Sequence, residues 1–472
     1  MTPRTDADGL QRRLDDALER ARTAADVPGA SVAVAVGDRT VLATSGVVST
    51  RTQVPVATDA LFQIQSITKV LTATLVLQLV DEGLVGLDDP VQRHLPEFRT
   101  ADPGASTRIT VRHLLTHTGG FEGDLWAPTT AGPDALDRFV RDLVPTAAQH
   151  SEPGTRFSYC NAGFGTLGRL VEVHRDLDYE HALRRHLTDP LGVEEIAFSA
   201  NQAVASRTAT GHIRPTPEEP LRPTREWALL PPSNPAAGNQ LALSARGLLA
   251  VGRLFLTRGR AADGTRLLSE ASAAAMLEPQ LAQRPGLAPP TTLQGLGWYL
   301  VAPGVAEHGG GMPGVASVLR VVPEAGVAVA GLTNADAGQA LLEDLLGSLH
   351  EELVGPLPDQ PTPSRTPPTD AHVDGCTGRY ATRQSVVTVT REDGRLWLTD
   401  EPRHERLAIA EAAGVADRTT RRELRPLEAG LCAVLDDDGR PTGTVSFLDP
   451  DAAGRYRFLA THRIAPRTAS PT

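Results

Sequence analysis

The sequence predicts a mixed α/β globular domain followed by a smaller, all-β domain. Its 472 residues are 40% apolar and 22% charged, a balance typical of folded domains rather than disordered or fibrous chains. An apolar run over 70–80 has the length of a buried helix, and the valine-rich segments 30–36 and 327–332 are typical of buried strands. After residue 372 the chain changes to short alternating segments separated by Asp-Gly turns, which indicate hairpins.

Composition excludes several classes of function and favours one compartment. The net charge is -11 at pH 7, so neither a nucleic acid nor an anionic membrane is expected as a partner. The longest apolar run is shorter than the roughly 20 residues that span a bilayer. The first residues lack the apolar core of a signal peptide, so we expect a cytoplasmic protein. Three widely separated cysteines, Cys160, Cys376 and Cys432, fit reduced thiols there better than a disulfide framework or a metal site.

Lys69 is the only lysine in the sequence, and the other residues in the total of 46 basic side chains are arginines. Arginine stays protonated near neutral pH because its pKa lies above ~12, whereas burial or a neighbouring cation can deprotonate a lysine. A lysine kept in such a background is a candidate catalytic base. The alternative is a surface lysine retained by chance.

Ser66 precedes Lys69 by one helical turn, at the start of the apolar run. Positions i and i+3 share a helix face, so the hydroxyl and the amine are expected within hydrogen-bond distance. The first turn of a helix also leaves backbone N–H groups free to stabilise an anion. Because serine is a weak nucleophile until a base removes its proton, this arrangement predicts an activated serine at Ser66.

Tyr159 and Asn161 form a second polar motif, in a predicted loop that leads into a helix over 167–173. A phenol can relay a proton beside a lysine, and an amide can hold a substrate carbonyl. The alternative is that both side chains only satisfy the backbone of the loop.

His308 begins a third motif, His-Gly-Gly-Gly, between two strand-like segments. Glycines on a strand edge let a ligand backbone approach closely and leave N–H groups free, so Gly309, Gly310 and Gly311 are candidate substrate contacts. His308 is alternatively a turn histidine.

The three motifs in the order Ser-x-x-Lys, Tyr-x-Asn, His-Gly-Gly resemble those of the penicillin-recognising serine acyltransferases, which include class C β-lactamases, D,D-peptidases and related esterases. The resemblance covers residues 10–355 and extends to the segments 30–36, 109–120, 235–241 and 295–298. It implies a β-lactamase/transpeptidase-like α/β (α+β) fold with an antiparallel sheet flanked by helices, over residues 1–355.

The same resemblance implies a role for each motif residue. Ser66 would be the nucleophile, Lys69 its general base and Tyr159 a proton shuttle, while Asn161 would contact Lys69 and the substrate amide. The backbone N–H groups of Ser66 and Gly311 would form the oxyanion hole. No metal and no cofactor is expected.

The sequence departs from the family pattern at two positions, and the first of them bears on the expected substrate. Many members carry Lys-Thr-Gly at the third motif, which binds a substrate carboxylate, whereas the variant with His308 occurs in D-aminopeptidases, esterases and peptide cyclases. A β-lactam is therefore not the expected substrate. Cys160 stands where the family usually has Ser or Ala, and we interpret it as an inert filler rather than a nucleophile.

Two further patterns are typical of a dinucleotide site and of a zinc site, but each has a structural interpretation. The run from Gly163 to Gly168 matches a dinucleotide-binding pattern but follows a loop, so it predicts close helix packing. His113 and His117 are expected on one helix face, as hydrogen-bonded structural histidines rather than zinc ligands.

A proline-rich linker over 356–371 separates the catalytic domain from a second domain over 372–472. Hairpins are predicted around Asp393-Gly394 and Asp438-Gly439, and the segment from Gly454 to Arg463 is predicted as the last strand. This domain is similar to the lipocalin-like β-barrel of several family members. On the last strand, Arg455 and Arg457 are candidates for an arginine that faces the substrate cleft, if the barrel forms one of its walls. The alternative, which we favour, is that both are structural arginines that face solvent.

A cytoplasmic member with this third motif and a barrel resembles the penicillin-binding-protein-type thioesterases. These take a nonribosomal peptide with a D-configured C-terminal residue onto serine and release it head to tail. The expected partner is then a peptidyl thioester, possibly on a carrier protein. The alternative is an intracellular serine hydrolase: an esterase, a D-aminopeptidase or an amidase. Both need the same serine, base and oxyanion hole, so the residues alone do not separate them.

Overall fold

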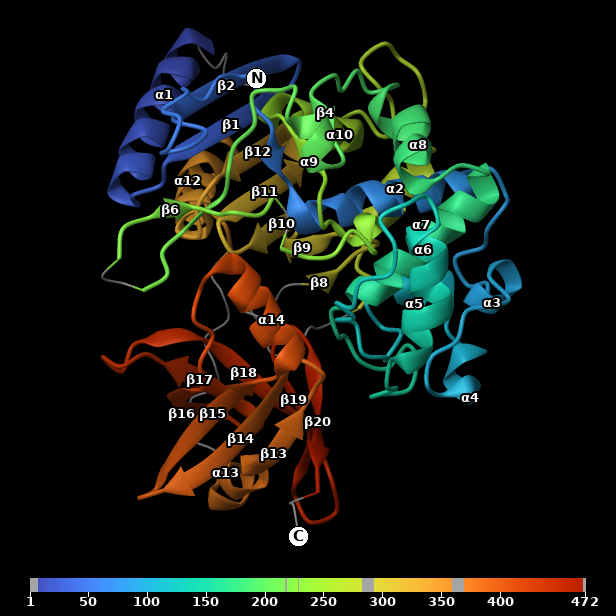
Figure 1. Ribbon diagram of the computed structural model, residues 1–472, viewed down its shortest axis with the longest axis vertical. Helices are drawn as coiled ribbons and strands as arrows, with labels where there is room; N and C mark the ends of the chain where they lie inside the picture. Colours follow the sequence, from blue (N-terminus) through green and yellow to red (C-terminus); the bar gives the residue numbers. More distant parts are fainter. Residues whose placement is uncertain (1–6, 217–218, 228, 282–292, 359–368, 470–472) are drawn as a thin grey trace.

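The computed structural model describes residues 7–216, 219–227, 229–281, 293–358 and 369–469 (Figure 1). Its N-terminal part is built on one antiparallel sheet of seven strands. In spatial order these are β2 (Arg39–Gly46), β1 (Gly29–Val36), β12 (Val327–Thr333), β11 (Val315–Val322), β10 (Val305–Met312), β9 (Tyr299–Ala302) and β8 (Leu293–Gln294).

Helices cover both faces of this sheet because its central strands are apolar on both sides. The helices α1 (Ala7–Ala24) and α12 (Gly338–Leu353) lie on one face, where their leucines form a core with the valines of β1. The helix α10 (Ala245–Leu256) lies on the other face, with Ser244 as its N-cap. The predicted antiparallel sheet flanked by helices is confirmed.

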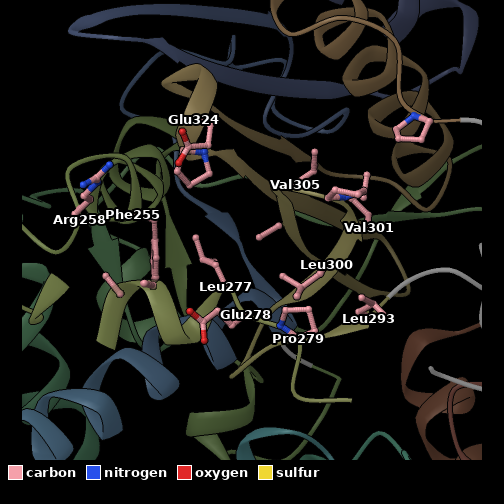
Figure 2. Close-up of a pocket in the computed structure, with 18 of the residues that line it drawn as sticks. Phe255, Arg258, Leu277, Glu278, Pro279, Leu293, Leu300, Val301, Val305 and Glu324 are labelled. Carbon is pink, nitrogen blue, oxygen red and sulfur yellow. The ribbon is translucent and has the colours of Figure 1, made fainter. Parts of the chain in front are cut away.

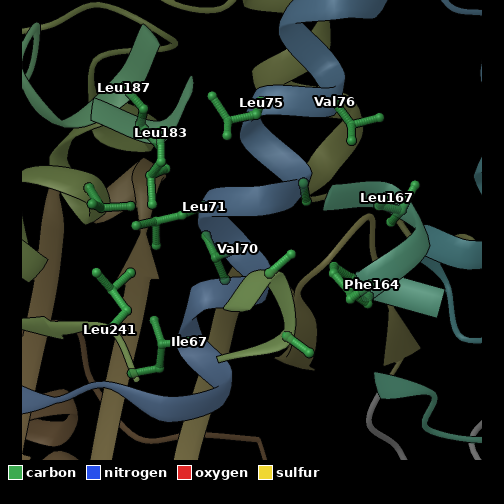
Figure 3. Close-up of a cluster of buried hydrophobic side chains, with 14 of the residues drawn as sticks. Ile67, Val70, Leu71, Leu75, Val76, Phe164, Leu167, Leu183, Leu187 and Leu241 are labelled. Carbon is green, nitrogen blue, oxygen red and sulfur yellow. The ribbon is translucent and has the colours of Figure 1, made fainter. Parts of the chain in front are cut away.

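A helical region is inserted between β2 and α10 and lies beside the sheet in Figure 1. It is centred on α2 (Thr68–Asp81), which is buried from Thr68 to Leu79, as the apolar run predicts. Figure 3 shows how Leu71 and Leu75 of α2 meet Leu183, at the end of α8, and Leu187, in the helical turn that follows α8. The other helices of this region are α3 (Val91–His94), α4 (Pro103–Ser106), α5 (Val111–Leu115), α6 (Ala135–Arg138), α7 (Asn161–Arg175) and α8 (Tyr179–Leu183).

Short elements complete the N-terminal part. A three-stranded sheet pairs β3 (Phe62–Gln63), β7 (Ala242–Leu243) and β4 (Ile196–Ala197), and β5 (His212–Ile213) pairs with β6 (Arg222–Pro223). The helix α9 (Ala200–Ala203) lies between β4 and β5 in the chain, and α11 (Glu270–Met276) lies between α10 and β8. No helix in the described ranges is long and apolar enough to cross a membrane.

The glycine pattern in α7 serves helix packing, as predicted. A Cβ on Gly168 would lie 2.4 Å from the Cβ of Ala236, and one on Gly165 would lie 2.8 Å from Oδ1 of Asn234.

The prediction that His113 and His117 share one helix face is only partly right. His113 lies in α5, but the helix ends at Leu115, and His117 follows it with a φ of 58°. His117 is nevertheless a structural histidine, because its Nδ1 accepts a hydrogen bond from the backbone N–H of Cys160 at 3.0 Å.

The C-terminal part is a closed barrel of eight antiparallel strands. The strands are β13 (Gly378–Ala381), β14 (Ser385–Glu392), β15 (Arg395–Pro402), β16 (Thr420–Glu428), β17 (Leu431–Leu435), β18 (Pro441–Pro450), β19 (Tyr456–Ala460) and β20 (Ile464–Thr468). The helices α13 (Asp370–Cys376) and α14 (His404–Ala413) accompany them. Most of the predicted linker, 359–368, lies outside the described residues.

Both predicted hairpin turns are present. Asp393 and Gly394, both with positive φ, connect β14 to β15, and Gly439 lies in the turn between β17 and β18. The predicted last strand is wrong, because the chain turns at 461–463 and adds β20. The turn, Thr-His-Arg, has neither glycine nor proline, so nothing in its composition marks it.

This turn between β19 and β20 docks the barrel on the N-terminal domain. The backbone N–H of Tyr159 donates to the carbonyl of His462 at 2.9 Å, and the N–H of Ile464 donates to Oγ of Ser158 at 3.3 Å. Arg463 forms an ion pair with Asp124, whose side chain is only 5% exposed. A second ion pair joins Arg156 to Asp449 of the barrel. The two domains therefore form one continuous structure at this edge.

We predict that Arg463→Ala destabilises the protein by roughly 2 kcal/mol, because it leaves the buried Asp124 without its cation. The value is below the range for fully buried pairs because Arg463 itself is 30% exposed. Urea unfolding measures the change. Arg455→Ala is the matched control, since the pair of Arg455 with Asp451 lies at the surface. Equal stability of the two variants would contradict this interpretation of the interface.

Candidate active site

Ser66 lies at the point where the chain enters α2. It is the middle residue of a short 3-10 helix, Gln65–Ile67, that continues into α2. Gln65 has a φ of 49°, in the left-handed region that few non-glycine residues adopt. Its buried side chain is held by a 2.7 Å hydrogen bond from its Nε2 to Oε1 of Gln63. The backbone just before the serine is thus held in an unusual conformation, and Ser66 remains half-buried at the cleft.

Lys69 is completely buried one turn further into α2. Its Nζ lies 3.2 Å from Oγ of Ser66 and donates to the carbonyl of Ala237 at 2.6 Å. Burial lowers the pKa of Lys69 well below its usual value of 10.5, and the nearby cation Arg463 acts in the same direction, whereas the carboxylate of Asp124 acts against it. A neutral amine at this distance can accept the proton of the Ser66 hydroxyl. The predicted proximity of the two groups is confirmed.

Tyr159 faces the same serine from the loop before α7. Its hydroxyl is hydrogen-bonded to Ser66, and Lys69 Nζ lies 4.8 Å from the centre of its ring. Burial raises the pKa of Tyr159 well above its usual value of 10, so the phenol keeps its proton. Burial thus shifts the two pKa values in opposite directions, down for Lys69 and up for Tyr159. The geometry therefore favours Lys69 as the base and leaves Tyr159 to pass a proton to or from the group that leaves or attacks Ser66.

Asn161 is the first residue of α7, not a loop residue. Its Nδ2 donates to Oδ1 of Asp124 at 2.8 Å, so its amide is oriented by a carboxylate rather than by Lys69. Arg463 binds the same carboxylate, and its guanidinium lies 5.1 Å from the centre of the Tyr159 ring. A residue of the barrel therefore completes the polar surroundings of the cleft.

Arg455 and Arg457, the predicted cleft-facing arginines, are both exposed, and Arg455 binds Asp451 of its own domain. Their exposure agrees with the alternative of solvent-facing structural arginines. The barrel arginine that lies beside Tyr159 is instead Arg463, on a tight turn that the sequence does not mark. Neither Asp124 nor Arg463 belongs to a recognised motif. In the sequence, Asp124 is marked only by following Gly123 shortly after Gly119 and Gly120, and this signal is weak.

His308 lies in β10, where it is buried and stacked on Tyr299, with ring centres 4.8 Å apart. Its Nδ1 and the carbonyl of Gly309 lie 2.7 Å apart, which fixes the ring. The ring of Tyr299 is also in contact with His462 of the barrel turn, through a hydrogen bond of 3.3 Å between the Tyr299 hydroxyl and Nε2 of His462. His308 is thus a wall of the cleft and not a turn histidine.

The glycines that follow bring β10 against the nucleophile. A Cβ on Gly310 would lie 2.2 Å from the carbonyl oxygen of Ile64, so only glycine allows this approach. A Cβ on Gly309 or Gly311 would meet only ordinary van der Waals contacts, at 3.8 Å from the carbonyl oxygen of Ser317 and 3.9 Å from that of Val315. On this stretch β9 no longer pairs with β10, since its register ends at Glu307. The backbone of β10 beside Ser66 therefore presents an edge to which an extended acyl chain can pair.

The segment after residue 234 holds the base in place. The short helix Pro235–Ala237 supplies the carbonyl that binds Lys69, and it ends at Gly238, whose φ is 105°. A Cβ at Gly238 would lie 2.0 Å from the carbonyl oxygen of Gln65. Asn234 anchors the segment to α7 through a 2.9 Å bond from its Nδ2 to the carbonyl of Asn161. The segment 234–238 thus connects α2, which carries Lys69, with α7, which begins at Asn161.

Cys160 lies between the two motif residues but is not built as a nucleophile. Its Sγ caps α7 by accepting the N–H of Gly163 at 3.2 Å. Burial raises the pKa of the thiol to about 12, so it stays protonated. This matches the interpretation of Cys160 as a filler.

The arrangement of a serine, a neutral amine, a protonated phenol and a glycine-rich strand edge is that of a serine hydrolase or acyltransferase. The comparisons with known proteins agree. The β-lactamase family model matches residues 14–349, and the chain belongs to that family.

Three relatives illustrate the likeness. Penicillin-binding protein 4 of Amycolatopsis lactamdurans is 40% identical over 339 residues, which is 71% of this chain and 88% of that protein. The structure of SurE is similar over both domains, with a TM-score of 0.78, 28% identity and coverage of 98% of this chain and 100% of SurE. A D-stereospecific amidohydrolase from Streptomyces sp. matches 72% of this chain and 99% of its own, with 26% identity and a TM-score of 0.55.

We predict that Ser66→Ala abolishes both covalent labelling by a fluorophosphonate and turnover, with a loss of at least ~10³-fold. Intact-protein mass spectrometry and a p-nitrophenyl ester assay measure the two effects. Cys160→Ser keeps an acceptor at the N-cap of α7 and is the control, expected to be labelled normally. Label found on Cys160 of the wild type would contradict the assignment.

The lowered pKa of Lys69 also predicts the pH profile. The enzyme needs the neutral amine, so kcat/KM should rise with pH through the lowered pKa and level off well below pH 10. Steady-state hydrolysis of an ester that does not titrate measures this limb. Lys69→Met should abolish turnover at all pH values. A limb centred near 10.5 would show that the amine is charged at neutral pH and is not the base.

Proposed function

We propose that the protein is a thioesterase that releases a peptide from a thioester and cyclises it head to tail, with a D-configured residue at the acyl end. In the first step Oγ of Ser66 attacks the thioester carbonyl, and its proton passes to Nζ of Lys69. The oxyanion is stabilised by the backbone N–H groups of Ser66 and Gly311. The thiol then leaves as its sulfur takes up a proton, with Tyr159 as the shuttle.

In the second step the peptide's own amine attacks the ester carbonyl of acylated Ser66. The amine loses a proton through Tyr159 and Lys69, and Ser66 Oγ regains one as the cyclic amide departs. Water attacking the same ester would give the linear acid. The fate of the acyl-enzyme therefore depends on which nucleophile the cleft admits.

The observation that supports cyclisation is the position of the barrel turn. His462 and Arg463 lie against Tyr159, the group that handles the proton of the attacking nucleophile. A wall at this place limits the access of water and turns a long acyl chain back toward the serine. The full-length similarity to SurE, which has also been solved with D-Leu, supports the same choice. The peptidyl thioester, a possible carrier protein and the stereochemistry belong to this proposal.

A simple hydrolase is the second candidate: an esterase, a D-aminopeptidase or an amidase. It is favoured by the similarity of the catalytic domain to the D-stereospecific amidohydrolase, which covers 72% of this chain. The two candidates share the acyl-enzyme and differ in its acceptor.

The test is a pair of octapeptide thioesters of N-acetylcysteamine that differ only in the configuration of the C-terminal residue. We expect the cyclic peptide from the D-substrate at a rate at least about tenfold above that from the L-substrate. Liquid chromatography with mass spectrometry distinguishes the cyclic product from the linear acid, which is heavier by one water. Ser66→Ala controls for spontaneous reaction. Only linear acid from both substrates would favour the hydrolase.

A further inference from the structure

A buried serine of the sheet lies behind the nucleophile. Ser317, in β11, has no exposed surface, and its Oγ donates to the carbonyl of Ile64 at 2.8 Å. The same carbonyl accepts the N–H of Ile67 at 3.2 Å, which closes the short turn that carries Ser66. The hydroxyl of Ser317 therefore ties β11 to the backbone that presents the nucleophile.

The same hydroxyl also lies against the glycine-rich strand. Its Oγ is 3.3 Å from the carbonyl oxygen of Gly310, the residue opposite Ser317 in the register of β10 and β11. A carbonyl this close faces β11. Because a peptide unit is planar and trans, the N–H at its other end, that of Gly311, points away from β11, toward the side on which β9 has stopped pairing. One buried hydroxyl thus contacts both backbone segments that would supply the N–H groups of the oxyanion hole.

Among the described residues, support for β10 from the side of β9 is limited. The pairing of β10 with β9 ends at Glu307, and a hollow of about 780 Å³ lies beside Val305 (Figure 2). The pairing with β11, in contrast, is continuous over 306–312. The position of Gly311 relative to the nucleophile is therefore set mainly from the side of β11.

The contact between strand, turn and hydroxyl is tight. A Cβ on Gly310 would lie 2.2 Å from the carbonyl oxygen of Ile64 and 2.5 Å from Oγ of Ser317. In such close packing, a shift of one group displaces the others. Donors of an oxyanion hole act at roughly 2.7–3.1 Å from the oxyanion, so a small displacement of either segment weakens a bond to it.

We propose that Ser317 is a positioning residue for acyl transfer. Its hydroxyl fixes the spacing between the N–H groups of Ser66 and Gly311, so that both reach the oxyanion. The inference rests on the proposed acyl transfer at Ser66, and it holds whether an amine or water accepts the acyl group. Because the oxyanion exists only in the tetrahedral state, loss of this spacing slows the reaction without weakening the binding of the substrate.

The test compares Ser317→Ala with Ser31→Ala. Ser31 is a similarly buried serine of the same sheet, in β1, and its Oγ has no hydrogen-bond partner among the described residues. The measurements are kcat and KM for a p-nitrophenyl ester and the inhibition constant of phenylboronic acid. Oγ of Ser66 adds to the boron of this inhibitor and gives its proton to Lys69, and no group leaves. The adduct is tetrahedral and negatively charged, like the oxyanion state.

We expect Ser317→Ala to lower kcat and to weaken binding of the boronic acid by about tenfold or more, with KM within about threefold of the wild type. Ser31→Ala should leave all three quantities within about twofold. A side chain that only stabilised the fold would not change kcat and the affinity for the boronic acid together while KM stays constant.

Urea unfolding shows whether each variant is folded under the assay conditions. If Ser317→Ala does not fold, Ser317→Cys fills the same site with a much weaker donor and should show the same two losses. The proposal is overturned if the boronic acid binds the folded variant within about twofold of the wild type, or if Ser31→Ala loses as much. Failure of the proposed function is distinct. Without acyl transfer at Ser66 the wild type would neither hydrolyse the ester nor bind the boronic acid, and without cyclisation both assays would be unchanged.

Discussion

Burial of a single amine is the constraint on which the site depends. Lys69 has no exposed surface, and its ammonium form would lose its hydration without gaining a carboxylate at hydrogen-bond distance. The folded chain therefore holds the neutral amine, with a pKa well below 10.5. Between that lowered pKa and 10.5 the unfolded chain binds more protons than the folded one, so stability rises with pH across this window. At neutral pH the protein is less stable than it would be with an apolar side chain here, and it gains a base.

Several elements exist to maintain that burial. The helix α2 is surrounded by α7 on one side and by the short helix at Pro235–Ala237 on another. A side chain on Gly168 would push α7 away from Ala236, and one on Gly238 would clash with the backbone of Gln65. The barrel adds Arg463, whose charge disfavours protonation of Lys69, while the charge of its ion-pair partner Asp124 favours it. The buried amine thus lies beside two opposed charges, one from each domain, and its burial remains the main cause of its lowered pKa.

Much of this architecture follows from local pattern. The apolar run predicts α2, the Asp-Gly pairs predict two hairpins of the barrel, and the spacing of Ser66 and Lys69 predicts their contact, because each depends only on residues close in sequence. The contributions of Asp124 and Arg463 depend on how two domains dock, which no short segment records. The sequence predicts strand at the turn that carries Arg463, because this turn has no glycine or proline. The resemblance implies a contact of Asn161 with Lys69, whereas the partner of Asn161 in the structure, Asp124, lies far outside its motif.

The barrel's interior has a consequence for how this enzyme can diversify. Its centre is filled by Tyr380, Phe447 and Tyr456, and the guanidinium of Arg467 binds the Tyr380 hydroxyl at 2.7 Å. A barrel packed in this way is a rigid support for the turn at 461–463, which lies outside this core. Substitutions of the His462 side chain can therefore reshape the mouth of the cleft, while Arg463 is constrained by its pair with the buried Asp124. One turn of the barrel thus carries both a position that can vary and a position that the other domain holds fixed.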